Sequence, residues 1–317
     1  MIRFATCASL LVAAALLAAP SGASAADYPS RPITVIVPFP AGGSTDNMAR
    51  AAAREFEDIL GTNIAVTNVG GGAGTVGTAQ LARARPDGYT IGVVPAAPLI
   101  NQPHMRKTPY SIADFDYICQ LFYSPQALAV KPDSPFKTLK DVVDYARAHP
   151  NELTYGTPGP ASLPHLAMEK FLQDTGVQMK HVPFQGDGPG VTALLGGHVD
   201  LYMAIISNVT KNDLTAVAVF ADERVEAAPD LPTSVEQGFP TTASWWGGVF
   251  APKGIPADAK TKLVDTCRQT AESKRFAETL NNLGTLVQFK DSAGVQKAVE
   301  EGSETNKALI DKVLKQQ

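Results

Sequence analysis

Two turns in the sequence join an apolar run to a helical pattern through glycines and hydroxyl side chains. The first, VPFPAGGSTD, spans residues 37–46 and places Gly42 and Gly43 just before Ser44. The second, YGTPGPASLPH, spans residues 155–165. Glycine lets backbone N–H groups point freely, and the start of a helix presents unpaired N–H donors at the positive end of its dipole. Both turns therefore have the chemistry of a site for a small anion.

Each turn also has a purely structural interpretation. In the first, Ser44, Thr45 and Asp46 compete for the N-cap position of the following helix. In the second, Ser162 caps a helix, and His165 in its first turn is predicted to be a structural hydrogen-bonding residue. Because one such turn occurs in each half of the chain, two helix N-termini could face one cleft, which favours a binding site.

A third glycine cluster, NVGGGAGTVGT at residues 68–78, contains the pattern G-x-G-x-x-G. In a dinucleotide-binding unit, an acidic residue after the next strand holds a ribose. Here the next apolar run ends at Pro95, and no acidic residue follows directly. We therefore predict that this backbone approaches a ligand or a neighbouring loop closely, and that it does not bind a dinucleotide.

The common catalytic motifs are absent from the sequence: there is no G-x-S-x-G, no phosphate loop, no H-E-x-x-H and no C-x-x-C. The five histidines have no metal-ligand spacing. An exported hydrolase with Ser44 or Ser162 as nucleophile is the alternative, although neither serine has an evident basic partner. The adjacent Trp245 and Trp246 are more typical of core or hinge packing than of ligand stacking, although one of them could line an aromatic pocket. The sequence predicts a protein that is not an enzyme and that uses no cofactor and no metal.

The bulk composition bounds the class of protein. The chain has 317 residues, of which 44% are hydrophobic and 18% charged, and its net charge is −4. These values are typical of a soluble globular protein with enough core for two domains. Since the lysines and arginines form no basic block, we expect no binding to nucleic acid.

The N-terminal segment has the pattern of a secretory signal peptide. Arg3 supplies a positive charge, residues 10–19 form an apolar stretch too short to span a bilayer, and Ala23-Ser24-Ala25 is a small-x-small cleavage site. We therefore predict a signal peptide over residues 1–25, cleavage near Ala25, and a periplasmic mature protein.

Three cysteines occur in the chain. Cys7 precedes the apolar stretch of the signal peptide, so it cannot carry a lipid anchor on the mature protein. Cys119 and Cys267 could pair in an oxidising compartment, but they lie far apart in sequence, and a chain of this size does not need a disulfide to fold. Two buried thiols are the favoured interpretation.

The elements that must position the two turns follow an α/β pattern. Short apolar runs alternate with helical segments, which is typical of a parallel sheet covered on both faces. Strands are expected at residues 33–37, 64–69, 89–94, 127–130, 153–155, 180–183, 199–203, 216–220 and 248–251. Helices are expected at residues 45–60, 75–83, 138–148, 163–173, 191–195, 256–273 and 292–315. The last two carry apolar stripes, and we expect them to return to the first domain.

Six segments together resemble one family. They are YPSRPITVIVPFPAGGSTD, RPDGYT, YGTPGPASLPHLAMEKF, HVPFQGDGPGVTALLGGHVDLYM, APDLPTSVEQGFP and SWWGGVFAPKGIPADAKTKL, and they cover nearly the whole mature chain in order. The sequence is similar to the Bug family, the TctC-like extracytoplasmic solute-binding receptors of tripartite tricarboxylate transporters.

The resemblance implies a type II periplasmic-binding-protein (Venus flytrap) fold, in which two α/β domains are joined by two crossing strands. Domain 1 would comprise residues 26–124 and 240–317, and domain 2 residues 125–239. The crossings would fall near residues 122–127 and 239–249. A monomer of this kind would capture a small-molecule organic acid, a di- or tricarboxylate or an aromatic acid, for membrane permease subunits of a tripartite tricarboxylate transporter or for a sensor kinase.

The resemblance also implies the ligand-binding residues. They are Phe39, Ala41, Gly42, Gly43, Ser44, Thr45, Asp46, Gly156, Thr157, Pro158, Gly159, Ala161, Ser162, Gln185 and Ser207. The sequence departs from the family pattern at Gln185, where lysine or arginine is common, and at Ala96 and Ala97, where small hydroxyl side chains are common. Residues 204–213 also form a shorter segment than usual. A less polar and less basic site points to a monocarboxylate or an aromatic acid rather than citrate.

Overall fold

The computed structural model describes residues 28–184 and 187–316. The predicted signal peptide and Gln185 lie outside the described residues. Within the described part of the chain, no helix is both long and apolar enough to cross a membrane.

The first body of the molecule is a sheet covered on both faces. Its strands follow the order β2-β1-β3-β9-β4, with β10 on the far side of β4. The strands are β1 (Ile33–Val37), β2 (Ile64–Asn68), β3 (Thr90–Pro95), β9 (Ser244–Pro252), β10 (Leu286–Lys290) and the first half of β4 (Phe115–Val130). One face packs on α1 (Ser44–Leu60), α9 (Ala257–Glu272) and α10 (Lys274–Asn282). The other face packs on α2 (Thr75–Ala82), α3 (Ala96–Ile100) and α11 (Ser292–Gln316). The two long C-terminal helices therefore do return to the first sheet, as the apolar stripes predicted.

The second body has the same construction. Its strands follow the order β6-β5-β7-β4, and β8 also pairs with β4. They are β5 (Thr154–Thr157), β6 (Lys180–Pro183), β7 (Leu201–Ile205), β8 (Ala216–Phe220) and the second half of β4. The helices on one face are α5 (Leu139–Ala148) and α6 (Leu163–Thr175), and those on the other are α7 (Asp187–Leu195) and α8 (Ile206–Lys211).

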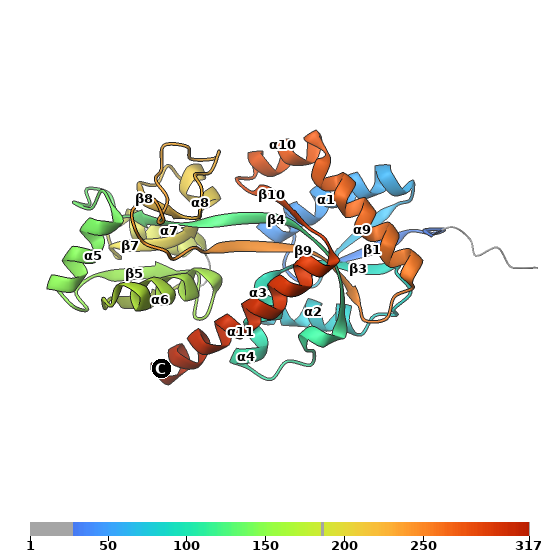
Figure 1. Cartoon of the computed structure of the whole chain (residues 1–317), viewed down its shortest axis with the longest axis horizontal. Helices are drawn as coiled ribbons and strands as arrows, with labels where there is room; N and C mark the ends of the chain where they lie inside the picture. Colours follow the sequence, from blue (N-terminus) through green and yellow to red (C-terminus); the bar gives the residue numbers. More distant parts are fainter. Residues whose placement is uncertain (1–27, 185–186, 317) are drawn as a thin grey trace, which may run out of the picture.

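Two strands cross between the bodies, as expected. β4 is sixteen residues long; its first half pairs with β9 and β10, and its second half with β7 and β8. β9 runs antiparallel along β4 until Ser244 lies opposite Pro125. Figure 1 shows both strands running between the two bodies, with α11 lying diagonally across the junction. The α/β class and the two crossing strands are confirmed, while the domain boundaries at 124/125 and 239/240 stay predictions.

A disulfide ties the crossing strand to a C-terminal helix. Cys119 of β4 and Cys267 of α9 are bonded, with a Cα–Cα distance of 6.4 Å, and both are fully buried. The favoured interpretation of two free thiols is wrong. The two residues are 148 positions apart, and they meet only because α9 returns to cover the face of β4 that carries Cys119.

A buried aromatic stack supports the connection from β5 to α6. The His165 and His181 rings stack with centroids 3.7 Å apart, and Tyr155 lies against His181 at 5.0 Å. His165 Nδ1 accepts a hydrogen bond from the Ala161 N–H (2.8 Å), which confirms its predicted structural role. His181 Nε2 lies 2.7 Å from Thr157 Oγ1. Burial lowers the pKa of His165 to about 4; burial, assisted by the neighbouring His165, lowers the pKa of His181 to about 4 as well.

The disulfide predicts a large loss of stability when it is removed. The double variant Cys119→Ala/Cys267→Ala should lose about 2–5 kcal/mol of unfolding free energy, because the bridge restricts a long loop of the unfolded chain. Urea unfolding followed by circular dichroism measures this loss. In the unreduced wild-type protein, unfolding should expose no thiol to an alkylating reagent; labelling of both cysteines without reduction would contradict the assignment.

The histidine stack predicts acid sensitivity. The unfolded state takes up protons near pH 6.5 and the folded state only near pH 4, so stability is complete above pH 6.5 and falls as the pH drops through this window. Each histidine should lower the free energy of unfolding by up to about 1.4 kcal/mol for each unit by which the pH falls within this window. His181→Phe keeps a stacked ring but does not titrate, so its melting temperature should depend less on pH between 6.5 and 4. The matched control is His198→Gln at an exposed position, which should follow the wild type; equal slopes in all three proteins would refute the assignment.

Candidate functional site

The carboxyl ends of the two sets of parallel strands face each other. β3 and β4 run in the same direction, because each is antiparallel to β9, and β1 is parallel to β3. β7 is antiparallel to β4 and parallel to β5, so β5 and β7 run back toward the first sheet. Ligands of open α/β sheets bind beyond the carboxyl ends of the strands. The junction between these two edges is therefore the candidate ligand site.

Four strand-to-helix connections meet this junction. They are the β1–α1 turn (residues 38–43), the direct step from β3 into α3, the β5–α6 turn (residues 158–162) and the direct step from β7 into α8. The predicted site residues lie in three of the four connections or beside them, and Ser207 is in the first turn of α8. The structure thus brings the two predicted turns and Ser207 to facing edges. Gln185 lies outside the described residues.

The β1–α1 turn leaves the start of α1 open. The N-cap is Gly43, with no side-chain cap hydrogen bond, which corrects the expectation that Ser44, Thr45 or Asp46 caps this helix. The first helical bond runs from the Asn47 N–H to the Gly43 carbonyl (3.0 Å), so the N–H groups of residues 43–46 lie outside the helical ladder. Residues 41–44 are exposed. The open end of a 17-residue helix is an attractive position for an anion.

Asp46 holds this turn in place instead of capping it. Its Oδ2 accepts hydrogen bonds from the Gly42 N–H (2.8 Å) and from Arg50 Nε (3.0 Å), and its Oδ1 accepts one from Asn68 Nδ2 (2.9 Å). The same Asn68 amide nitrogen lies 3.0 Å from the Phe39 carbonyl. Burial acts to raise the pKa of Asp46, but the bonds from Arg50, Gly42 and Asn68 outweigh it and hold that pKa below its ordinary value. Asp46 is only 2% exposed, so it positions the turn and does not present its carboxylate at the surface.

The third glycine cluster packs against the same turn. A Cβ atom on Gly77 would lie 2.5 Å from the Val69 carbonyl oxygen and 2.7 Å from Pro38 Cα. A Cβ atom on Gly74 would lie 3.0 Å from the Phe39 ring. The predicted close approach to a neighbouring loop is confirmed, and the neighbour is the β1–α1 turn.

The β5–α6 turn is built differently, because its polar groups are used internally. Ser162 Oγ caps α6 by accepting from the His165 N–H (3.3 Å), as predicted. Thr157 Oγ1 donates to the Gly159 carbonyl (3.2 Å) in addition to its contact with His181. Gly156 is required by packing, since a Cβ atom there would lie 2.7 Å from the Tyr202 ring. The two facing helix N-termini are therefore unequal: α1 is open and α6 is capped.

Asn101, which the sequence reasoning did not identify, joins the two sides of the junction. This residue follows α3 and is fully buried. Its Nδ2 donates to the Ala161 carbonyl in the β5–α6 turn (3.1 Å), and its Oδ1 accepts from Asn306 Nδ2 of α11 (2.8 Å). These partners lie 60 and 205 positions away in the sequence, so no local pattern could have identified them.

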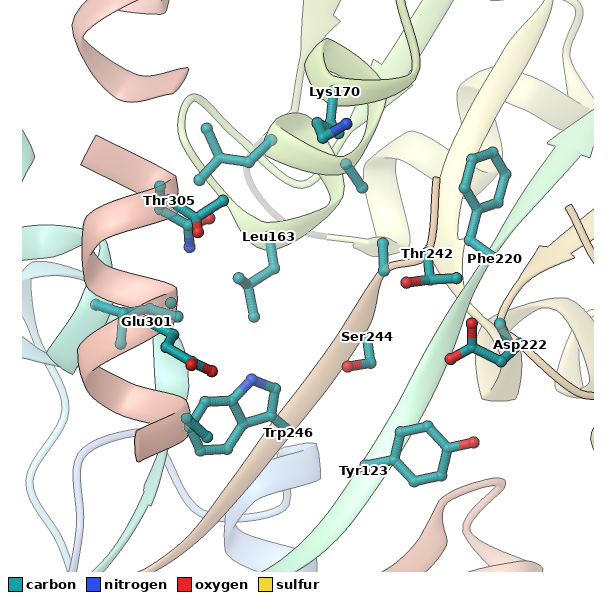
Figure 2. Close-up of a pocket in the computed structure, with 18 of the residues that line it drawn as sticks. Tyr123, Leu163, Lys170, Phe220, Asp222, Thr242, Ser244, Trp246, Glu301 and Thr305 are labelled. Carbon is teal, nitrogen blue, oxygen red and sulfur yellow. The ribbon is translucent and has the colours of Figure 1, made fainter. Parts of the chain in front are cut away.

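A hollow of about 720 Å³ adjoins the crossing strands and lies between α6 and α11. Figure 2 shows Ser244 and Trp246 of β9 on its floor, Glu301 and Thr305 of α11 on one side, and Leu163 of α6 above Trp246. None of the predicted site residues lines it. Trp245 packs instead on Phe122, with ring centroids 5.0 Å apart, in the core of the first body. Trp245 thus packs in the core, as predicted, whereas Trp246 lines the hollow, which was the alternative for one of the two.

Comparison with known proteins identifies the family. Residues 48–314 match the model of the TctC family, described as the tripartite tricarboxylate transporter family receptor. The Bordetella pertussis protein BugT is 34% identical over 286 residues, which cover 88% of this chain and 87% of BugT.

Solved structures give the same result. The Rhodopseudomonas palustris protein MatC with bound malate is 28% identical, with a TM-score of 0.73 over 89% of this chain and 100% of MatC. A second R. palustris protein, solved with adipate, is 29% identical, with a TM-score of 0.78 over 90% of this chain and 98% of its own. The predicted type II binding-protein architecture, with its two crossing strands, is also the fold of solved relatives described as a TctC solute-binding protein and as the periplasmic binding protein BugD. The chain belongs to the TctC family of tripartite tricarboxylate transporter receptors, the family that includes the Bug proteins.

Proposed function

We propose that this chain is a periplasmic receptor that captures a small organic carboxylate between its two domains. The observation that carries the proposal is the open, uncapped N-terminus of α1, held at the junction by the buried Asp46. Unpaired N–H groups at a helix start bind anions, and the positive end of the dipole adds to the attraction. The relatives solved with malate and adipate support the same class of ligand.

The proposed mechanism uses the backbone of the β1–α1 turn as the carboxylate site. Asp46 fixes the Gly42 N–H, so the turn does not have to be ordered when the ligand arrives, which lowers the cost of binding. Ser44 adds a hydroxyl at an exposed position. The β5–α6 turn and Ser207 would close the other side and exclude water, which strengthens each hydrogen bond to the ligand. Under this proposal Thr45, Asp46, Thr157 and Ser162 shape the site and do not contact the ligand through their side chains.

A linear dicarboxylate is the ligand that we propose. Malate and adipate, the ligands of the two solved relatives, carry a carboxylate at each end. One carboxylate would occupy the start of α1, and the other would reach the walls formed by α3 and α8. Gln185 stands where the family pattern commonly has lysine or arginine, and this less basic residue makes an aromatic acid the competing outcome.

The protein would deliver its ligand to the membrane subunits of a tripartite tricarboxylate transporter or to a sensor kinase, after export by the predicted signal peptide. Catalysis is not part of the proposal. Ser162 Oγ is occupied as a helix cap, and within the described residues Ser44 has no hydrogen bond to a histidine or an acidic side chain. The hydrolase alternative therefore has no observation in its favour.

Ligand binding is tested with the mature chain after unfolding and refolding, which removes any bound metabolite. Isothermal titration with adipate, malate, citrate and benzoate should give saturable binding for a dicarboxylate, and the melting temperature should rise with ligand concentration. Saturation by benzoate alone would move the assignment to aromatic acids. Binding of none of a wider panel of carboxylates, or turnover of a bound ester, would overturn the receptor function.

Gly43→Asp tests the carboxylate position directly. Gly43 has φ −78° and ψ 170°, and a Cβ atom there would meet only the Pro40 carbonyl oxygen, at 3.4 Å. Aspartate is a slightly better N-cap residue than glycine, so the variant should be as stable as the wild type or more stable by up to about 0.5 kcal/mol. Its carboxylate would occupy the start of α1, and dicarboxylate binding should weaken by about ten-fold or more.

Gly43→Ala is the matched control, because it adds a Cβ atom without a charge or a cap. It should retain most of the affinity. If Gly43→Asp binds dicarboxylates as tightly as Gly43→Ala does, the carboxylate does not bind at the start of α1.

A further inference from the structure

We infer that Asn101 is a positioning residue for ligand binding: from the first domain, it fixes the backbone of the β5–α6 turn of the second domain. The inference rests on the proposed receptor function for its effect on affinity. Its structural part, the control of the turn and of the interdomain distance, can be measured without a ligand.

The environment of Asn101 determines how its amide is oriented. The Ala161 carbonyl can only accept a hydrogen bond, so the Asn101 atom 3.1 Å from it is the donating Nδ2. The remaining Oδ1 then accepts from Asn306 Nδ2 at 2.8 Å. Because Asn101 is fully buried, breaking either bond without a replacement would leave a buried polar group unpaired, which is costly.

Ala161 is held in an unusual backbone conformation between the two domains. Its φ is +49°, in the left-handed region that residues with a Cβ atom rarely adopt. Its N–H donates to His165 of its own domain (2.8 Å), and its carbonyl accepts from Asn101 of the other domain. Strained residues of this kind persist only where their surroundings hold them, and they cluster at ligand-binding turns. Loss of the Asn101 bond would let Ala161 relax and would reorient the turn.

The helix that supports Asn101 also bridges the domains. Near its start, Val295 and Val299 of α11 pack on the first sheet. Further along, Leu309 and Ile310 form a buried cluster with Ala161 and Leu166 of the second body. Figure 1 shows this course of α11 from the first body toward α6. Separation of the domains must therefore break the Asn101–Ala161 bond and the packing around Ala161 together.

The alternative is that Asn101 contributes only to general stability. The two interpretations differ in what a substitution changes. A stabilising contact without a positioning role would alter only the melting temperature. It would leave unchanged the ligand affinity, the protection of the β5–α6 turn amides from hydrogen exchange, and the interdomain distance. A positioning residue would alter the last three even in a variant that stays well folded.

Asn101→Asp is the sharpest variant, because it has nearly the same shape and keeps an oxygen to accept from Asn306 but loses the donor to Ala161. Asn101→Ser removes the amide without introducing a charge and serves as the second variant should the aspartate disturb folding. Ser303→Ala is the matched control. Ser303 lies on α11, as Asn306 does, and the variant removes its hydrogen bond with His104 of α4 (2.8 Å). The Ala161 carbonyl stays paired.

The ligand-free measurements use spin labels and hydrogen exchange. Labels at Arg54→Cys in α1 and Gln173→Cys in α6, both exposed, report the interdomain distance by pulsed electron resonance, since the native cysteines are disulfide-bonded. Asn101→Asp and Asn101→Ser should shift the distribution to longer distances and speed amide exchange in residues 159–166 by about ten-fold or more. Ser303→Ala should match the wild type in both.

The ligand measurement uses adipate by isothermal titration and stopped flow. The two Asn101 variants should bind about ten-fold or more weakly, mainly through faster dissociation, while Ser303→Ala stays within about two-fold of the wild type. Unchanged distance and exchange in both Asn101 variants would overturn the inference, whether or not adipate binds. Failure of the wild type to bind any carboxylate would overturn the proposed function instead, and the ligand-free data would still decide the role of Asn101.

Discussion

The continuous pairing of β4 is the constraint on which the rest of this structure depends. One sixteen-residue strand belongs to both sheets, and its direction fixes that of every strand that pairs with it. β9 must oppose it, β3 and β1 must then run along it, and β7 and β5 must run against it. The carboxyl ends of both parallel sets are thereby directed at one junction. The Cys119–Cys267 disulfide lies on this strand, so the element that orders both domains is also covalently fixed to the helix layer of the first.

The electrostatic attraction at the junction depends on how the negative charge of Asp46 is compensated. Asp46, the acidic residue in the first turn of α1, is neutralised by Arg50 at 3.0 Å and buried beneath the β1–α1 turn. Its negative charge is therefore compensated locally, and the attraction that remains at the surface is that of the N–H groups at the start of α1. An anion site of this kind needs no lysine or arginine contact. Under the proposed function it would hold the group common to all carboxylates, and selection among them would be left to the surrounding walls.

Local patterns in the sequence predicted the elements well and the long-range contacts poorly. Apolar runs correctly located β1 and β8 and placed β7 two residues too early, and the capping residue Ser162 correctly located the start of α6. The first half of β4, FDYICQL, was not predicted, because its polar residues are buried at the centre of a sheet that the local pattern does not reveal. β10 and α10 were also missed. At the site, both turns and His165 were predicted, whereas the N-cap Gly43 was not, because Asp46 turns back to Gly42, Asn68 and Arg50. The Cys119–Cys267 bond and the Asn101 contacts depend on partners that only the tertiary fold brings near.

Under the proposed receptor function, the unequal starts of α1 and α6 explain how the junction would bind and still release a ligand. If both helix starts were open, a dicarboxylate would bind each of them strongly and hold the domains together through its own charges. Of these two helix starts, α1 is open, while the β5–α6 turn satisfies its own donors through Ser162, Thr157 and His165. A ligand can then be held chiefly by one domain, and the second domain adds affinity through shape and the exclusion of water. Opening the junction would remove that second contribution without first breaking the carboxylate contacts, which suits a receptor that must transfer its ligand to another protein.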